Sequence, residues 1–249
     1  MRRVLLAAVV GVVTGVGVAA ASASDPPASL QNFVCHRALK PSARYVAVEG
    51  VMHARAGEPR MAMRFELFWK TSSNGPWTQV RSGDLGKWKT APNGLGQNPN
   101  DTWEVNKPVS NLYAPATYRF RVSFRWSGGS SPVHTTLQSP TCFEPELRPD
   151  LYVKSITVLG AVHHPAGYDR YVTVVGNQGA SASGPFQVQF ADGSSKPQYA
   201  KVQSLRPHSQ ARLKFVGPSC PPNSVTVTAD PFDQVDDSSR ANNTLTLNC

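Results

Sequence analysis

The feature that most constrains this chain is an alternation of apolar and polar residues along two long stretches. Residues 118–126 place Tyr, Phe, Val, Phe and Trp on one side, with Arg119, Arg121 and Arg125 on the other. Residues 61–70 alternate in the same way, except that Ala62 and Phe68 are apolar residues on the side of Arg64, Glu66 and Lys70. A period of two residues brings every second side chain to the same face of a β-strand. Both stretches therefore predict strands with one face in a core and the other in solvent.

The composition favours an all-β chain with two cores. Charged residues make up 16% of the sequence, while 21 prolines and 19 glycines supply many turns. This balance is typical of short strands joined by tight connections. A hydrophobic share of 40% excludes wholesale disorder, and 249 residues are enough for two domains.

The first 24 residues are predicted to be a signal peptide. Arg2 and Arg3 precede an apolar run over residues 5–20, and Ala-Ser-Ala-Ser follows at residues 21–24. The run is shorter than the roughly 20 residues that span a bilayer, so we expect cleavage rather than retention as an anchor. No later segment is apolar enough to span a membrane. The mature chain is therefore expected to be secreted, either extracellular or loosely associated with the cell envelope.

Four cysteines follow the signal sequence, at Cys35, Cys142, Cys220 and Cys249. An even number in an exported chain predicts two disulfides, for which three pairings exist. Pairing of Cys35 with Cys142 and of Cys220 with Cys249 is the simplest, because each pair then lies within one half of the chain. The sequence contains no C-x-x-C motif, which argues against zinc binding and redox catalysis.

A proline-containing segment at residues 144–149 is predicted to join two domains. Pro145 and Pro149 favour an extended, semi-rigid connector. The composition also changes here, since all five tryptophans precede the segment. We therefore expect one β-sandwich at residues 30–143 and a second at residues 150–249.

A short motif in the first domain resembles a known corner structure. The stretch from Leu112 to Tyr118 reads Leu-Tyr-Ala-Pro-Ala-Thr-Tyr and is followed by an alternating strand. It resembles the tyrosine corner of immunoglobulin-like and fibronectin type III sandwiches. The resemblance implies that Tyr118 anchors a corner through its hydroxyl and has no catalytic part.

The second domain resembles a known module. It opens with Pro-Asp-Leu at residues 149–151, continues with Asn-Gln-Gly at residues 177–179 and closes with a double Asn at residues 242–243. This order resembles the CARDB domain, a cell-adhesion-related module of bacterial surface and secreted proteins, over residues 149–248. The resemblance implies a seven-stranded immunoglobulin-like sandwich, used as a spacer or adhesion module, without enzymatic activity. The expected fold is thus two tandem immunoglobulin-like antiparallel β-sandwiches.

Two sets of side chains in the first domain are candidate ligand-binding groups. Arg119, Arg121 and Arg125 share one strand face and could bind carboxylate, sulfate or phosphate groups bidentately. The alternative is a charged face that only keeps the sandwich soluble. Three tryptophans in loop-like sequence, within or near residues 83–106, could stack on sugar rings or could fold back over the sandwich ends. These are Trp77, Trp88 and Trp103, whereas Trp69 and Trp126 are expected in the core.

An acidic segment near the C-terminus is the candidate metal site. It contains Asp230, Asp233, Asp236 and Asp237, and calcium prefers such oxygen ligands. The spacing is not that of an EF-hand, and Arg240 would repel a cation. The alternative is that these side chains shape turns by binding backbone N–H groups. We therefore expect no cofactor; calcium is the one metal that these side chains could bind.

The sequence contains no Gly-x-Ser-x-Gly elbow, no H-E-x-x-H motif and no phosphate-binding glycine loop. The expected function is that of a secreted, non-enzymatic adhesion or binding protein. Its targets would be cell-envelope or extracellular polymers, either anionic or polysaccharide, because removal of Arg2 and Arg3 still leaves a net charge of +7 out of +9. The alternative is an accessory or inhibitory protein that binds another secreted protein or enzyme. Nucleic acid is not expected, since the basic residues are scattered.

Overall fold

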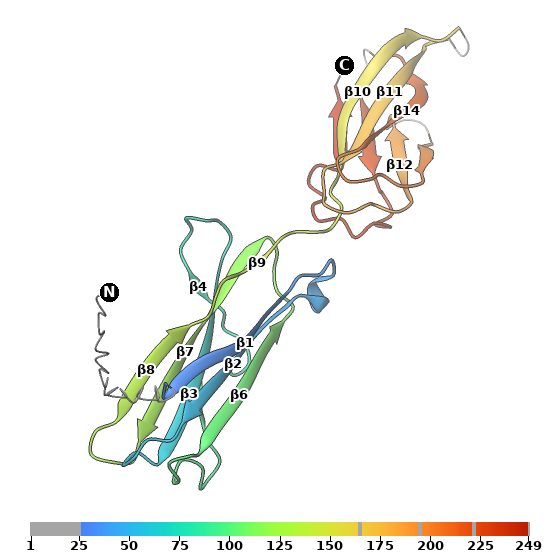
Figure 1. Ribbon diagram of the computed structural model, residues 1–249. Helices are drawn as coiled ribbons and strands as arrows, with labels where there is room; N and C mark the ends of the chain where they lie inside the picture. The colour runs from blue at the N-terminus through green and yellow to red at the C-terminus, as the bar shows by residue number, and fades with distance from the viewer. Residues whose placement is uncertain (1–25, 164–165, 194–195, 221–222, 249) are drawn as a thin grey trace, which may run out of the picture.

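The computed structural model describes residues 26–163, 166–193, 196–220 and 223–248. Within these ranges the chain is all-β, with sixteen strands and one short 3-10 helix at Pro41–Ala43. The strands form two β-sandwiches joined by an extended segment, as Figure 1 shows. The predicted fold class is therefore confirmed. The signal peptide expected at residues 1–24 lies outside the described residues, and no helix in the described ranges is long and apolar enough to cross a membrane.

The first sandwich packs a three-stranded sheet against a six-stranded sheet. The smaller sheet has the order β1-β2-β6, with β1 at Ala28–His36, β2 at Tyr45–His53 and β6 at Thr102–Ser110. The larger sheet has the order β4-β3-β7-β8, with β4 at Thr78–Gln79, β3 at Arg60–Lys70, β7 at Ala116–Ser127 and β8 at Val133–Gln138. Two further strands pair at its margins: β5 at Trp88–Thr90 beside β3, and β9 at Cys142–Glu144 beside β7. All of these pairs are antiparallel.

The second sandwich has seven strands within the described residues. One sheet has the order β10-β11-β14, with β10 at Leu151–Ala161, β11 at Tyr168–Asn177 and β14 at Gln210–Pro218. The other has the order β13-β12-β15-β16, with β13 at Gln198–Val202, β12 at Phe186–Ala191, β15 at Val225–Ala229 and β16 at Thr244–Leu247. This order matches that of the first sandwich once β5 and β9 are set aside. Two dissimilar sequences thus adopt one immunoglobulin-like topology.

Each sandwich has its own core, and the alternating stretches build the first one. Along β7 the large buried side chains are Tyr118, Phe120, Val122, Phe124 and Trp126, as their period predicts, whereas the burial of Ser123 on the opposite face departs from it. They meet the buried apolar face of β3 and that of the opposite sheet in one cluster. In the second core, the Phe190 ring lies 5.1 Å from that of Tyr171 and 5.0 Å from that of Phe215, measured between centroids. The two cores share no residue, which is the arrangement of two separate domains.

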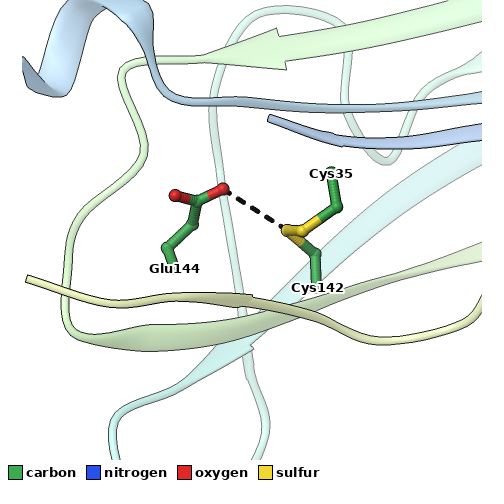
Figure 2. A group of neighbouring side chains, drawn as sticks. All are labelled: Cys35, Cys142 and Glu144. Atoms are coloured by element: carbon green, nitrogen blue, oxygen red, sulfur yellow. Dashed lines mark hydrogen bonds between the residues drawn. A yellow bond between two sulfur atoms is a disulfide. The ribbon is translucent and has the colours of Figure 1, made fainter. Parts of the chain in front are cut away.

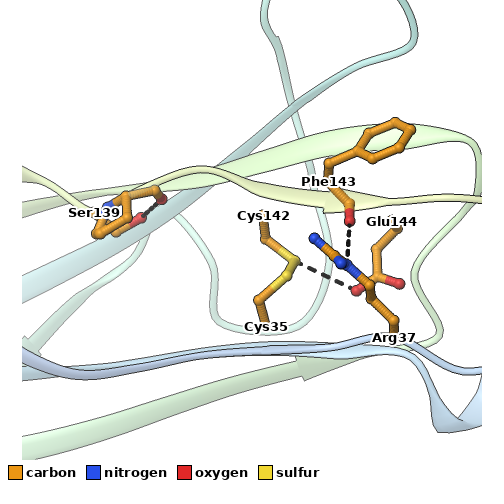
Figure 3. Close-up of a disulfide and its surroundings, with 7 residues drawn as sticks. Cys35, Arg37, Ser139, Cys142, Phe143 and Glu144 are labelled. Carbon is orange, nitrogen blue, oxygen red and sulfur yellow. Dashed lines mark hydrogen bonds between the residues drawn. A yellow bond between two sulfur atoms is a disulfide. The ribbon is translucent and has the colours of Figure 1, made fainter.

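A disulfide joins the two sheets of the first sandwich, as Figure 3 shows. It links Cys35 of β1 to Cys142 of β9 across 107 residues of chain. In the chain-entropy model, a crosslink closing a loop of this length stabilises the fold by about 4.7 kcal/mol. This predicted pair is confirmed. The second predicted pair, Cys220 with Cys249, includes a residue outside the described part and stays a prediction.

Ion pairs hold the segment between the sandwiches. Arg44 is buried, and its guanidinium donates to the carbonyls of Ala38 and Leu39 and, at 2.9 Å, to Glu146 Oε1. Glu146 also accepts hydrogen bonds from Arg148, which pairs with Asp236 at 3.3 Å. Burial alone would raise the pKa of Glu146, but the hydrogen bonds from Arg148 and Arg44 outweigh it and lower this pKa. One carboxylate therefore connects the first domain to the start of the second.

The tyrosine corner is present as the sequence predicted. Tyr118 is buried, and its hydroxyl donates a hydrogen bond of 2.8 Å to the carbonyl of Tyr113. Burial raises the pKa of Tyr118 to about 12, so this hydroxyl stays protonated and remains a donor at physiological pH. The bond fixes the turn between β6 and β7.

We predict that Tyr118→Phe lowers the free energy of unfolding by about 1–2 kcal/mol, because the substitution leaves the carbonyl of Tyr113 without its donor. Urea unfolding monitored by tryptophan fluorescence would measure this difference. Tyr113→Phe is the matched control, since the Tyr113 side chain is exposed and its hydroxyl has no partner among the described residues. Equal stability of the two variants would contradict the prediction.

Candidate functional site

The outward side chains of β3 and β7 form one continuous surface. Pairing places Glu66 beside Arg121, Phe68 beside Arg119 and Ala62 beside Arg125. Neighbouring outward residues on paired strands lie about 5 Å apart, within reach of long side chains. We call this surface the Arg–Trp face; it comprises Arg64, Glu66, Phe68, Lys70, Trp77, Trp88, Arg119, Arg121 and Arg125.

Aromatic rings separate the cations of the Arg–Trp face. The guanidinium of Arg119 lies 4.2 Å from the centroid of the Trp77 ring, and Lys70 Nζ lies 5.1 Å from the same ring. The guanidinium of Arg121 lies 4.6 Å from the Phe68 ring. These distances are those of cation–π contacts. Two of the three tryptophan candidates thus belong to the same surface as the arginine candidates.

Trp88 lies across several strands of the sheet. It belongs to β5, which pairs with β3, yet its ring lies 4.5 Å from the guanidinium of Arg125 on β7 and 4.9 Å from that of Arg64 on β3. An edge contact of 6.5 Å continues to His134 on β8. The Nε atoms of Arg64 and Arg125 are buried without a hydrogen-bond partner among the described residues. The indole therefore contacts two arginines whose Nε atoms make no hydrogen bond there, although Arg64 Nε forms an ion pair with Glu66 Oε2 at 3.7 Å.

The charge of the Arg–Trp face is strongly positive. It carries five cationic side chains and one carboxylate, that of Glu66. Arg121 binds Glu66 through two hydrogen bonds of 3.0 and 3.1 Å. Arg119 and Arg125 have no carboxylate partner among the described residues. Among the four arginines of the face, these two are therefore the ones available to an anionic ligand, because Arg64 and Arg121 both pair with Glu66.

A small pocket opens between the aromatic and cationic groups. Its volume is about 200 Å³, and it is lined by Phe68, Trp77, Arg119, Arg121 and Gln138. The guanidinium of Arg119, which has no carboxylate partner among the described residues, could bind an acidic group here, while the amide of Gln138 and the two rings contact the apolar body to which that group is attached. A carboxylated or sulfated sugar unit has this character.

The third tryptophan candidate does not belong to the surface. Trp103 lies on β6, is only 7% exposed and joins the core. The loop position expected for Trp103 is therefore wrong, and so is the one expected for Trp88, which lies on β5. Trp103 and Val105 alternate with Glu104 and Asn106, a strand pattern that the Gly, Pro and Asn content of the preceding residues obscured.

The remaining two tryptophans differ in their burial. Trp126 is fully buried as expected, and its Nε1 donates to the carbonyl of His53 at 2.8 Å. Trp69 packs only partly against the core and lines a cavity at the end of the sandwich.

The acidic residues of the second domain serve several separate contacts. Asp230 accepts backbone hydrogen bonds of 2.9 Å from Gln234 and Val235. Asp233 pairs with Arg240 at 2.5 Å. These carboxylates thus shape the loop before β16.

The other two aspartates of this set point to different partners. Asp236 pairs with Arg148 at 3.3 Å, and Asp237 accepts hydrogen bonds from the backbone of Leu151 and Ser239 and from the amide of Asn243. Burial raises the pKa of Asp237. In the described part of the chain, the four aspartates are not gathered at ligand distance from one another.

The motif residues of the second domain hold its strands together. Asn177 accepts from the backbone N–H groups of Asp150 and Gly179, and its amide donates to the carbonyls of Ser181 and Leu205. The Asn242 amide donates to Asp150 Oδ1 at 3.0 Å. These polar groups satisfy buried backbone atoms where several strands meet, so the motif carries a structural role.

One cluster in the described residues has the spacing of a metal site, but its chemistry does not fit. It consists of Cys35, Cys142 and Glu144, shown in Figure 2. Both sulfurs belong to the disulfide, so neither can act as a thiolate ligand. Glu144 is fully buried: one carboxylate oxygen lies 3.4 Å from Cys142 Sγ and the other has no partner among the described residues. Burial raises the pKa of Glu144.

We predict that Glu144→Gln gains stability relative to the natural chain as the pH rises from about 4 to about 7. A carboxyl with a raised pKa in the folded state binds its proton more tightly than in the unfolded chain. Its stabilising contribution is therefore present at low pH and is lost as the pH rises through the two pKa values. Thermal unfolding at a series of pH values tests this, with the exposed Glu104→Gln as control. Parallel curves for Glu144→Gln and the natural chain would refute it.

The comparisons with known proteins identify the second domain. The CARDB family model matches residues 148–247, so this part of the chain is a CARDB domain, an adhesion-related bacterial β-domain, as its motifs predicted. No curated protein matches the sequence.

Several solved structures share a loose similarity with the whole chain. The crystal structure of the class 5 fimbriae chaperone CfaA is 8% identical, covers 88% of this chain and 97% of its own, and has a TM-score of 0.29. The CsuC–CsuE chaperone–tip adhesion subunit complex of Acinetobacter baumannii is 9% identical over 80% and 93%, with a TM-score of 0.27. The exo-chitosanase CsxA of Amycolatopsis orientalis is 13% identical over 90% and 26%, with a TM-score of 0.26. Scores this low say nothing about function.

Proposed function

Because residues 148–247 form a CARDB domain, we propose that this chain is a secreted, non-enzymatic adhesion protein. Its first domain binds anionic polysaccharide of the cell envelope or the extracellular space through the Arg–Trp face. The second domain acts as the adhesion-related module that presents the first. The proposal includes export through the predicted signal peptide.

The observation that carries this proposal is the pairing of unneutralised arginines with indole rings. Arg119 packs on Trp77 and Arg125 packs on Trp88, and neither has a carboxylate partner in the described chain. A stacked guanidinium is already held in one orientation, so binding an anion costs less side-chain entropy than it does for a free arginine. Both indole side chains are partly exposed, so the ring surface that the cations leave uncovered can contact the carbon skeleton of a sugar.

The extent of the face favours a polymer over a small ion. Arg119 and Arg125 lie six residues apart on one strand, which corresponds to about 20 Å. Several units of a polysaccharide can contact such a surface at once, and each weak contact raises the effective concentration for the next. The attraction is electrostatic in part and should therefore weaken with salt.

One feature favours the alternative of a protein partner. Tyr199 and Phe232 of the second domain stack with ring centroids 5.4 Å apart, and they are 45% and 54% exposed. Exposed aromatic pairs of this kind are enriched in protein–protein interfaces. An accessory protein that binds another secreted protein would use this pair rather than the arginines.

We predict that Arg119→Ala with Arg125→Ala weakens binding of residues 25–249 to polygalacturonate by about tenfold. Two exposed charge contacts of about 0.7 kcal/mol each give this factor. The matched control is Arg206→Ala with Arg212→Ala, which removes the same charge from exposed positions of the second domain. Binding is measured by affinity electrophoresis in gels containing the polymer, with uncharged galactan gels beside them.

Equal loss in the two double variants would mean adsorption by net charge, without a defined site. Absence of retardation by any anionic polymer would refute the proposed function. The alternative would be established if the chain binds another secreted protein and this binding is lost in Tyr199→Ala with Phe232→Ala but kept in Arg119→Ala with Arg125→Ala.

We further predict that Trp77→Ala lowers the binding that remains at about 1 M salt, where charges beyond about 3 Å are screened. The ring is then the main contact with the sugar skeleton. Trp77→Phe should keep part of the binding at this salt concentration, because a phenyl ring can still stack on the sugar. Identical binding of the natural chain and Trp77→Ala under these conditions would show that the ring serves only the fold.

A further inference from the structure

A second cavity lies at the end of the first sandwich, between the margins of its two sheets. Its volume is about 480 Å³, within the range of small-molecule sites. It is formed where β3, β4 and β6 end and where the chain turns toward β7. Trp69 lines it from the inward side of β3, whereas the Arg–Trp face occupies the outward side of the same sheet. The two sites are therefore distinct.

Two aromatic rings and an apolar floor shape the cavity. The rings of Trp69 and Tyr113 meet edge to face, with centroids 5.7 Å apart, and Tyr113 is 58% exposed. Val80, Val109 and Leu112 supply the floor. Trp69 Nε1 has no hydrogen-bond acceptor among the described residues, unlike Trp126 Nε1, which is bound to a carbonyl. An indole donor thus borders the cavity without a partner.

Four further polar side chains border the cavity, and none has a hydrogen-bond or ion-pair partner in the described chain. They are Arg81, Ser82, Ser110 and Asn111. Asn111 has a φ of 58°, a left-handed conformation that asparagine tolerates better than most residues. It lies in the turn after β6, two residues before Tyr113. Two other polar groups of the lining are engaged: Gln79 donates to Glu66 at 3.4 Å, and the Tyr118 hydroxyl donates to the carbonyl of Tyr113. One cation and several neutral hydrogen-bonding groups therefore surround an aromatic slot.

We propose that this cavity binds one uronic acid residue of a glycan. The apolar face of the sugar ring would lie against Tyr113 and Trp69, and its hydroxyls would bond with Ser110, Asn111 and the indole N–H. Its carboxylate would pair with Arg81. An inorganic anion would make no use of the rings and the floor, and an aliphatic peptide side chain would make no use of the polar groups. A carboxylated sugar uses both.

This inference extends the proposed glycan binding to a second site, and it stands even if the Arg–Trp face binds no polymer. The cavity has room for a single residue rather than for a long chain. It should therefore bind short oligosaccharides, one per protein molecule, and should discriminate by the carboxylate.

The test uses residues 25–249 and trisaccharides of galacturonic, glucuronic and mannuronic acid, each beside its methyl ester as a neutral match. Calorimetry gives stoichiometry and affinity, and ¹H–¹⁵N spectra follow the indole N–H of Trp69, assigned with Trp69→Phe. We expect saturable binding of at least one acid at one per chain, with a shift of the Trp69 indole signal. Arg81→Gln should lower the affinity for the acid trisaccharide by about tenfold, while the affinity for its methyl ester should change by less than about twofold.

Tyr113→Ala should lower the affinity for the acid and for the methyl ester equally, because it removes the ring on which both sugars would stack. Arg81 and Tyr113 are exposed, so these variants leave the core intact. Arg119→Ala with Arg125→Ala should leave trisaccharide binding unchanged, which separates this site from the Arg–Trp face. The inference is overturned if no trisaccharide binds, or if Arg81→Gln and Tyr113→Ala both bind like the natural chain. It is also overturned if binding disappears only in the Arg119 and Arg125 variant.

Discussion

The register of β3 against β7 fixes both the core of the first domain and its outer surface. Met61 pairs with Trp126 and Lys70 with Thr117, without a break between them. Because side chains alternate, a slip of one residue would exchange the two faces of a strand, placing arginines in the core and phenylalanines in solvent. The large buried rings of β7 exclude such a slip, and the same constraint aligns the outward arginines. The arrangement of the Arg–Trp face is thus a consequence of how the core packs.

The polar contacts of the connecting segment depend on one carboxylate, that of Glu146. Glu146 neutralises the buried Arg44 and orders Arg148. The prolines on either side restrict the backbone, but they do not by themselves determine where the charges lie. The predicted semi-rigid connector is therefore held by side chains whose partners come from distant parts of the sequence.

Local sequence patterns predicted several strands and motifs of this molecule. The features that they did not predict depend on contacts between residues distant in the sequence. The two-residue period identified β3 and β7, and short motifs identified the tyrosine corner and the CARDB domain. Trp88 could not be placed in this way, because β5 has only three residues and its ring position depends on pairing with β3. Trp69 alternates with core residues, yet its strand continues to the margin of the sandwich, where the ring borders a cavity instead of a filled core. The two-residue period predicts on which face of a strand a side chain lies. It does not predict where along that strand the opposite sheet ends and stops covering it.

The position of the disulfide has a mechanical consequence for the adhesion function proposed above. Cys35 lies in the first strand, and Cys142 lies just before the connecting segment. Tension applied between the chain ends would pass from β1 through the sulfur bridge directly into the connector. Nearly the whole first sandwich belongs to the covalent loop between the two cysteines and cannot be drawn out by such a pull. The load would instead fall on the connector and on the second domain, while the Arg–Trp face keeps its shape.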